Sequence, residues 1–460
     1  MSRRLASAIV ALALAGCSLA PPYQRPAAPV PPSFPKGEAY ASPDAGALPT
    51  VSYRDLFRDA RLRTLIAQAL ADNRDLRIAA ANLAAARAQV TVTRSAQFPE
   101  VGVSGSATYR KGAGDSYALQ GGVSSFELDL FGRLANATAA ERERALASEA
   151  DARTVRIRLV ADLTEAWVSY AQDRDLMVIA QDTATNAIKA VQLTRLRLEG
   201  GIAPRTDLRQ AEQVLDTAQG DVAQQKTALA QDENLIRLLV GVDFDRSLLP
   251  GDLAEIDGKF VALAPGTASE VLLRRPDVEQ AEHSLKAANA NIGVARAELF
   301  PHISLTGLLG LASGALGSLF TGGAFTATAG ADAAYTIFDA GGRRANVKVS
   351  EAQRNAALAT YEKAIQTAFR EVSDVLAVRG TIGDRLAAAR ANSSAATDTA
   401  RLSDARYREG IDNFLASLVA QRALYTARRD EAAVTAASLE NLVELYRALG
   451  ADTFAPGAAP

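Results

Sequence analysis

The 460-residue sequence is poor in the side chains that most enzymes and metal sites use. It holds one cysteine, two histidines, two methionines and one tryptophan. A single cysteine cannot form a disulfide within the chain or supply a cluster of thiolate ligands. The two histidines, His283 and His302, are interpreted as structural residues, and no constellation of nucleophile, base and oxyanion site is found. We therefore expect no enzymatic activity, no metal site and no cofactor.

Two further absences limit the partners and the way a membrane could be crossed. Fifty Lys and Arg residues balance 52 Asp and Glu residues, so no basic surface indicates a nucleic-acid partner. No apolar run reaches the roughly 20 residues that a transmembrane helix needs. If the mature chain crosses a membrane, it must do so as a closed β-barrel, because only helices and barrels satisfy their backbone polar groups in lipid.

The N-terminus indicates where the protein is sent. A short basic stretch, Met1-Ser2-Arg3-Arg4, precedes an apolar run at residues 5–15, which fits the core of a signal peptide. Leu14-Ala15-Gly16-Cys17 then has the pattern of a bacterial lipobox. Residues 1–16 are predicted to be removed, leaving Cys17 as the acylated first residue. Because Ser18 is not aspartate, resemblance to known lipoproteins predicts a lipid-anchored protein of the outer membrane that extends into the periplasm.

The most informative pattern is an internal repeat. An Ala-rich helical stretch ends at Phe98-Pro99 and again at Phe300-Pro301, 202 residues later, and an alternating strand follows each time. The Gly-Arg-x-Ala-Asn stretch that begins at Gly132 returns at Gly342. A repeat of this length predicts two copies of one large supersecondary unit.

The repeat divides the mature chain as follows. The expected parts are an extended N-terminal segment (17–54), repeat one (55–241, with a β-hairpin at 100–130 and a long helical hairpin at 133–240), a linker (242–269), repeat two (270–450, with a β-hairpin at 302–338 and a helical hairpin at 343–449) and a disordered tail (451–460). The first long helix, 133–199, contains no proline or glycine. At 1.5 Å per residue it would be roughly 100 Å long.

The predicted strands alternate apolar with small polar residues. After each Phe-Pro, one face carries side chains expected to contact lipid, namely Val101, Val103, Ile303 and Leu305, and the phase of the alternation slips before Phe126. This pattern is typical of transmembrane β-barrels, although a soluble β-sandwich can also show it. Four strands cannot close a barrel, which needs about eight. Two copies would supply eight strands and three would supply twelve, and a conducting pore favours three.

Longer motifs resemble a known family. Residues 272–282, LLRRPDVEQAE, resemble the LLxRRPDIxxAE stretch of the TolC-like outer-membrane factors, in the lipoprotein branch with OprM, CusC and NodT. Residues 288–301 continue the match, and residues 126–133 look like the family's junction between strand and helix. The resemblance implies an α+β membrane protein that forms a homotrimer, with a twelve-stranded outer-membrane β-barrel continuing into a periplasmic α-helical barrel. Its expected partners are outer-membrane lipids, a periplasmic adaptor and an inner-membrane RND transporter, and its expected cargo is drugs or other toxic compounds.

The same resemblance places a gate at the tips of the helical hairpins. The candidate gate residues are Arg205, Asp207, Arg408, Asp412 and Leu415, with ion pairs expected between these acids and these arginines. Val419 stands where OprM-like relatives commonly carry an aspartate, so either Leu415 or the nearby acids could form the main constriction. The hypothesis from another class is a lipid-anchored periplasmic coiled-coil spacer without a channel, which leaves the four alternating segments unexplained.

Overall fold

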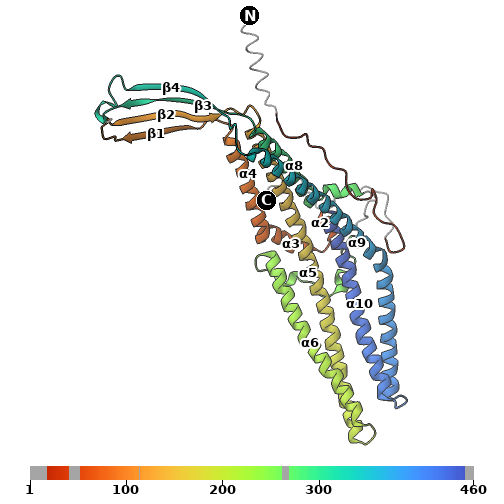
Figure 1. Ribbon diagram of the computed structural model, residues 1–460. Coiled ribbons are helices and arrows are strands. Elements are labelled where there is room, and N and C mark those ends of the chain that lie inside the picture. The colour runs from red at the N-terminus through yellow and green to blue at the C-terminus, as the bar shows by residue number, and fades with distance from the viewer. Residues whose placement is uncertain (1–17, 41–51, 113, 262–268, 451–460) are drawn as a thin grey trace. The chain divides into compact units, whose positions relative to one another are not determined.

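The computed structural model describes residues 18–40, 52–112, 114–261 and 269–450 (Figure 1). The predicted signal peptide, the predicted lipid-bearing Cys17 and the tail at 451–460 lie outside the described residues. Among the described residues, no helix combines the length and the apolar character that crossing a membrane would require.

The helices occur in matched pairs. Helices α4 (Arg74–Ser95) and α8 (Pro276–Ala297) have 22 residues each. Helices α5 (Arg133–Glu199) and α9 (Gly342–Arg408) have 67 residues each, and their hairpin partners α6 (Arg205–Val240) and α10 (Phe414–Leu449) have 36 each. Equal lengths in all three pairs confirm the two-repeat organisation predicted from the sequence.

Glycine ends these helices at equivalent places. Gly201 and Gly410, just beyond α5 and α9, have φ values of 73° and 74°, a left-handed conformation that is strained for residues with a Cβ. Gly241 ends α6 at φ 83°, and a Cβ there would lie only 2.6 Å from the carbonyl oxygen of Asp72. The chain therefore turns sharply where both long helices stop.

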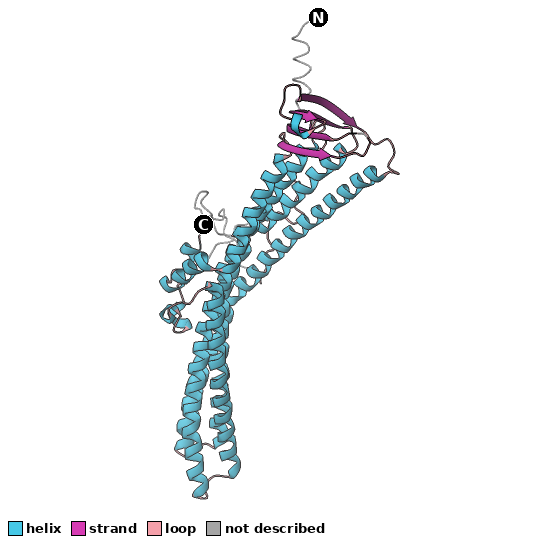
Figure 2. Cartoon of the chain, turned by 90° about the vertical axis from the view of Figure 1, so that its left-hand side faces the viewer, coloured by secondary structure: helices cyan, strands magenta, loops and turns pink. Residues whose placement is uncertain are grey.

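The strands form one antiparallel sheet (magenta in Figure 2) in the order β1-β2-β3-β4. The strands are β1 (Val101–Thr108), β2 (Ser116–Glu127), β3 (His302–Ser313) and β4 (Phe325–Ala334). Repeat one supplies the first two strands and repeat two supplies the last two. Strands β1 and β4 are the edges of this sheet, so each leaves a row of backbone N–H and C=O groups without a neighbouring strand of the same described chain.

Side chains on the two faces of the sheet differ as the alternation predicts. Paired residues Val103 and Gly121 lie on one face, and paired Ser104 and Gln120 lie on the other. The register between β2 and β3 shifts between Val123 and Phe126, which is where the sequence predicts the phase slip. Bulges of this kind bend a strand and change which side chains face each way.

The short elements differ in detail from the sequence prediction. The start of repeat one, where the pattern of residues 55–72 predicts one short amphipathic helix, forms two helices, α2 (Tyr53–Leu56) and α3 (Ala60–Asp72). The side chain of Asp59 accepts from the backbone N–H of Arg61 and so caps a new helix. The predicted linker holds ordered elements: η1 (Arg246–Leu248), α7 (Leu253–Ile256) and the start of η2 (Ser269–Arg274). An antiparallel bridge between Phe57 and Phe260 joins the linker to the segment after α2.

The chain forms two compact units. The first contains residues 80–151 and 277–364 together with the described residues up to 29, and it holds the sheet. The second contains residues 30–79, 152–276 and 365–460, as far as these are described, and it holds the tips of both helical hairpins. Its fully buried side chains include Trp167, Phe57 and Tyr446, and the indole N–H of Trp167 donates to the Leu248 carbonyl at 3.0 Å.

Within the first unit, the start of the N-terminal segment is bound to α8 between Leu19 and Arg25. The guanidinium of Arg25 forms two hydrogen bonds to Glu282, at 3.0 and 2.6 Å. Asn289 donates to the Pro21 carbonyl at 2.7 Å, and a Cβ at Gly293 would lie 2.8 Å from the backbone nitrogen of Ala20. The segment after the predicted lipid site is therefore held against the protein.

Candidate functional site: the tips of the helical hairpins

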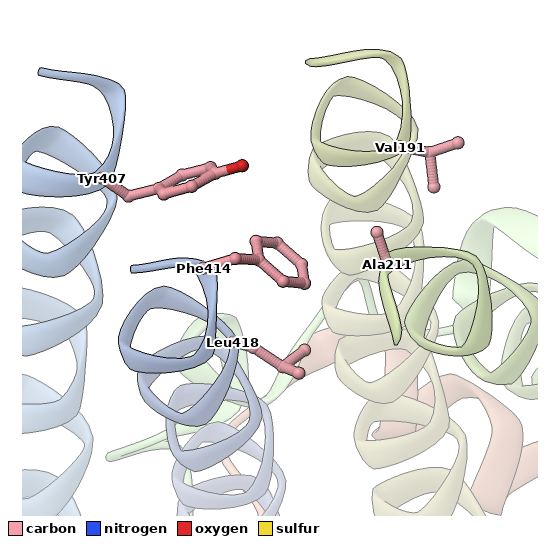
Figure 3. Close-up of a cluster of buried hydrophobic side chains, with 5 residues drawn as sticks. All are labelled: Val191, Ala211, Tyr407, Phe414 and Leu418. Atoms are coloured by element: carbon pink, nitrogen blue, oxygen red, sulfur yellow. The ribbon is translucent and has the colours of Figure 1, made fainter. Parts of the chain in front are cut away.

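The two hairpin tips meet in an apolar cluster. Its buried side chains come from all four helices of the hairpins (Figure 3): Val191, Ala211, Tyr407, Phe414 and Leu418. The rings of Tyr407 and Phe414 are 5.4 Å apart. Such burial removes apolar surface from water, and each Å² removed stabilises the packed state by about 25 cal/mol. The tips of repeats one and two are therefore packed together within one chain.

Arg197 adds a polar link between the last turns of α5 and α9. Its guanidinium lies 4.3 Å from the centre of the Tyr407 ring, and Nη2 donates to the carbonyl oxygens of Tyr407 and Arg408 at 3.1 Å each. These carbonyls belong to the end of α9, where a helix leaves its carbonyl oxygens without helical partners and favours positive charge. The sequence interpretation missed Arg197, because its partners lie more than 200 residues further along the chain.

Within one chain, the charged groups at the tip of α9 pair differently from the predicted gate, and pairs of Arg408 between copies of the chain stay a prediction. Arg406, not Arg408, binds Asp412, through hydrogen bonds of 2.6 and 3.0 Å. The turn at Gly410 folds the chain back so that the N–H of Ile411 donates to the Arg406 carbonyl at 2.9 Å. This contact brings Asp412 beside Arg406, and the hydrogen bond lowers the pKa of Asp412 below its usual range. Arg408 instead pairs with Asp404 at 2.7 Å, one turn back on α9.

The remaining candidate gate residues occupy accessible positions at the tips. Leu415 is 55% exposed, and Val419, one turn further along α10, is 58% exposed. Their neighbours Phe414 and Leu418 are buried in the apolar cluster. Helix α10 therefore packs one face inside the chain and presents a second apolar face outward. In the first turn of α6, Arg205 is exposed and Asp207 is half-buried.

Further along the hairpins, polar groups join α6 to α10. The phenol of Tyr425 donates to Asp221, and burial together with this bond raises the pKa of Tyr425 to about 12. Arg422 donates to the side-chain oxygen of Gln213 at 3.2 Å. The cluster, the Arg197 link and these bonds lie on successive turns, so the contact between the hairpins extends beyond the tips.

A cavity of about 660 Å³ lies beside the cluster, among α5, α9 and α10. Its lining mixes apolar residues such as Leu193 and Leu424 with charged residues, including Lys189 and Arg401. The hairpins are thus packed at the tips and leave space between helices nearby.

The predicted membrane residues lie on the sheet of the first unit. Val101 and Val103 on the edge strand β1 are 74% and 79% exposed. On the inner strand β3, Leu305 is 38% exposed and Ile303 is half-buried. Such apolar exposure on a strand is costly in water and favourable in lipid.

The histidines are placed among structural contacts. Nδ1 of His283 lies 2.6 Å from Oε2 of Glu143, so α8 and α5 are joined there. Nδ1 of His302 lies 3.5 Å from Oε1 of Glu127, where β2 ends and β3 begins. Neither histidine is near the hairpin tips in sequence, and both connect elements of the first unit.

A four-stranded sheet with two edge strands, built with paired long helical hairpins, is the protomer fold of outer-membrane efflux channels. The chain belongs to the outer membrane efflux protein family, whose model matches residues 65–242 and 267–451. The members of this family are transport proteins of the outer membrane, and this protein is an outer-membrane efflux channel.

Individual relatives agree with this assignment. The chain is 40% identical over 463 residues to the toluene efflux pump outer membrane protein TtgC of Pseudomonas putida, covering 97% of this chain and 95% of that protein. A membrane protein from Pseudomonas aeruginosa has a similar crystal structure, with a TM-score of 0.89, 34% identity and coverage of 96% of this chain and 100% of that one. The open state of the MtrE outer membrane channel of Neisseria gonorrhoeae is also similar, with a TM-score of 0.86 and 30% identity. The match covers 94% of this chain and 98% of that one.

Proposed function

We propose that this protein is the exit duct of a tripartite efflux system, conducting drugs or other toxic small molecules passively from a periplasmic pump to the exterior. The observation that carries the proposal is the open sheet. Four antiparallel strands leave β1 and β4 as free edges, and edges of this kind cannot remain unpaired in lipid. Three copies supply twelve strands, enough to close a barrel wide enough to conduct.

The helices fit the same assembly. Three copies bring twelve long helices, which can continue the barrel as a tunnel across the periplasm. A spacer protein without a channel would need the helices but has no use for four alternating strands, so the duct accounts for more of the chain.

The partners and cargo follow from the class of protein. A passive duct supplies no energy for export, so we infer that a periplasmic adaptor joins it to an inner-membrane RND transporter that does. A duct that only conducts requires no catalytic group and no cofactor. TtgC is named for toluene, so we infer that small apolar toxic compounds are among the molecules carried here.

The lipid anchor belongs to the proposal as well. The lipobox at residues 14–17 predicts acylation of Cys17, and several acyl chains on one residue give stable anchoring at about 0.8 kcal/mol per buried CH₂. The N-terminal segment supports this role, because Leu19, Pro21 and Arg25 are hydrogen-bonded to residues of α8. Labelling with a fatty acid analogue should mark the parent protein and not Cys17→Ser.

The tips are the proposed gate. Six hairpin tips in a trimer would surround one opening, with Leu415 and the acids Asp207 and Asp412 as candidates for its narrowest ring. The Arg197 link and the apolar cluster keep each pair of tips together. Binding of an adaptor would then open the mouth by favouring a state in which these contacts are rearranged.

The mass of the detergent-solubilised protein tests the assembly. We expect a trimer from outer membranes that resists SDS at room temperature and dissociates on heating, as closed barrels do. A folded protein that remains monomeric in native mass spectrometry would overturn the proposed duct, because one sheet of four strands cannot enclose a pore.

A further inference from the structure

The loops of the two β-hairpins lie at the end of the sheet far from α8 (Figure 1). The first loop follows Thr108 at the end of β1, and the second follows Ser313 at the end of β3. They are neighbours, because a Cβ at Gly314 in the second loop would lie 3.7 Å from the carbonyl oxygen of Asp115 in the first. With the helices in the periplasm, as the proposed duct requires, both loops face the exterior.

The first loop carries the only lysine and arginine of both hairpins. Arg110 and Lys111 are the only such residues in the ranges 101–126 and 303–338. Both side chains are exposed. Within the described part of the chain neither forms an ion pair, and Asp115, the acid of the same loop, is half-buried. The two cations are therefore available to an anion from outside the chain.

Apolar side chains lie beside these cations. The second loop, residues 314–324, contains no charged residue, and its Leu316 and Phe320 are 60% and 75% exposed. Tyr109, next to Arg110 in the chain, is 80% exposed. A surface that offers both cations and apolar groups fits an amphiphile with an anionic headgroup better than a soluble anion, because both parts of the amphiphile find a partner.

Exposed aromatic side chains mark the two boundaries of the membrane on β4. Phe325 begins this strand and Tyr335 directly follows it, and they are 67% and 57% exposed. They are ten residues apart, so the alternation puts both on one face, and at about 3.3 Å per residue they are about 33 Å apart. A strand tilt of about 40° reduces this distance to a height of about 25 Å, which equals the apolar band between the two aromatic girdles of membrane barrels. Phe325 therefore marks the outer boundary of the hydrocarbon.

The two cations lie just beyond this boundary. Phe325 shares one row of the sheet with Gly105 of β1, through the paired residues of β3 and β2 between them. Thr108, three residues beyond Gly105, is about 8 Å further out at the same tilt, and Arg110 and Lys111 follow it. The headgroup layer beyond the hydrocarbon is about 5–8 Å thick. Long basic side chains at this height can therefore reach phosphates at the outer margin of that layer.

We propose that Arg110 and Lys111 bind the phosphate groups of a phosphorylated glycolipid in the outer leaflet, while the apolar side chains beside them contact its hydrocarbon chains. A guanidinium can donate two parallel hydrogen bonds to one phosphate, and an ammonium adds a point charge. Phosphates carried on a sugar stand further from the hydrocarbon than a phosphate attached directly to glycerol, so they fit the height of these cations better. This inference rests on the proposed duct and assigns the lipid class that its outer end recognises.

Native mass spectrometry of detergent-purified trimers can follow binding during a titration with lipid A, a diphosphorylated glycolipid. A Lys or Arg near anionic headgroups strengthens binding about fivefold, so Arg110→Gln/Lys111→Gln should bind lipid A roughly 25-fold more weakly than the parent. Arg110→Lys/Lys111→Arg keeps both charges and should bind nearly as well as the parent. Dephosphorylated lipid A should bind the parent and the glutamine variant equally.

The matched control removes the same charges at the other end of the sheet. Arg344 and Lys348 are exposed residues of α9, near its start after β4. Arg344→Gln/Lys348→Gln should bind lipid A as the parent does. Inorganic phosphate at the concentration of the lipid should not compete, because it has no apolar part. Resistance of each trimer to SDS before heating shows that the variants assemble.

Three results would overturn the inference while leaving the duct intact. Trimers of Arg110→Gln/Lys111→Gln that bind lipid A as tightly as the parent would show that these cations hold no phosphate. Equal losses in this variant and the α9 control would indicate attraction by total charge. Competition by inorganic phosphate would indicate a site for free anions. Absence of any trimer in the parent protein removes the proposed duct together with this inference, so the two failures are distinguishable.

Discussion

Arg197 at the end of α5 lies 4.3 Å from the ring centre of Tyr407 at the end of α9, and it donates to the carbonyl oxygen of the same tyrosine. One side chain thus contacts both the ring and the backbone of a residue in the other repeat. Because these helices end at the proposed mouth, this contact opposes the separation of the two tips.

Replacing Arg197 with alanine should loosen the mouth. A cation–π contact contributes about 0.5–1 kcal/mol at a partly exposed site, and hydrogen bonds to charged groups contribute about 1.5–3 kcal/mol each. We expect larger or more frequent openings in single-channel recordings. Arg370→Ala is the matched control, because Arg370 is an exposed α9 residue paired with Asp374 one turn away. Equal conductance in Arg197→Ala and the parent would show that this contact does not restrain the gate.

Two variants separate an apolar constriction from an acidic one. Leu415→Ala removes an exposed apolar side chain beside the buried Phe414 and should widen an apolar ring. Asp207→Asn/Asp412→Asn removes two negative charges, including the partner of Arg406, and should alter the conductance of an acidic ring. Leu402→Ala, at an exposed position of α9, serves as the control. If neither variant changes the conductance, the constriction lies elsewhere along the duct.

An arginine should destabilise the trimer at one strand residue and be tolerated at the next. Val103 is 79% exposed on the apolar face of β1, whereas Ser104 points to the other face. An arginine on the lipid side near the middle of a bilayer costs about 2–4 kcal/mol, while water in the lumen can solvate one. We expect Val103→Arg to lose most heat-modifiable trimer and Ser104→Arg to retain it. Comparable losses in both variants would contradict the assignment of the faces.

Half-buried carboxyl groups make the second unit sensitive to pH. Burial raises the pKa of Glu165 to about 7, against partial compensation by Arg447. Burial and the neighbouring Asp173 raise the pKa of Asp232 to about 7. Both values exceed the roughly 4 expected in an unfolded chain. Between about pH 4 and pH 7, the folded protein holds protons that the unfolded chain has released. The free energy of unfolding therefore falls as the pH rises over this range and through the folded pKa of about 7.

We therefore expect a lower Tm at about pH 8 than at about pH 5.5, as the linkage predicts. Glu165→Gln/Asp232→Asn should reduce this difference, because neutral amides do not titrate. Glu199→Gln, at the exposed end of α5, should leave it unchanged. A double variant with the full pH dependence of the parent would assign the effect to other groups.

Features with a local cause were predictable from the sequence. The lengths of the helices follow from runs without proline or glycine and from the glycines that end them, and the bulge in β2 follows from the slipped alternation before Phe126. The small helices of the linker depend on caps such as Asp252, which accepts from the Glu255 N–H. These were missed because each is shorter than a periodic pattern can show.

Features that depend on three-dimensional placement were not predictable. Asp412 pairs with Arg406 because a left-handed turn brings them together, and sequence spacing alone made Arg408 look as suitable. Arg197 and Tyr407 meet only when the two repeats pack side by side at their tips. The repeat itself, by contrast, was visible in the sequence.

Electrical recording from planar lipid bilayers tests the channel most directly. Trimers purified in detergent should insert and give discrete conductance steps, small in the parent protein and larger in the Arg197→Ala and Leu415→Ala variants. Trimers that insert into the bilayer yet give no conductance steps in any of the three proteins would contradict an open duct through the assembly.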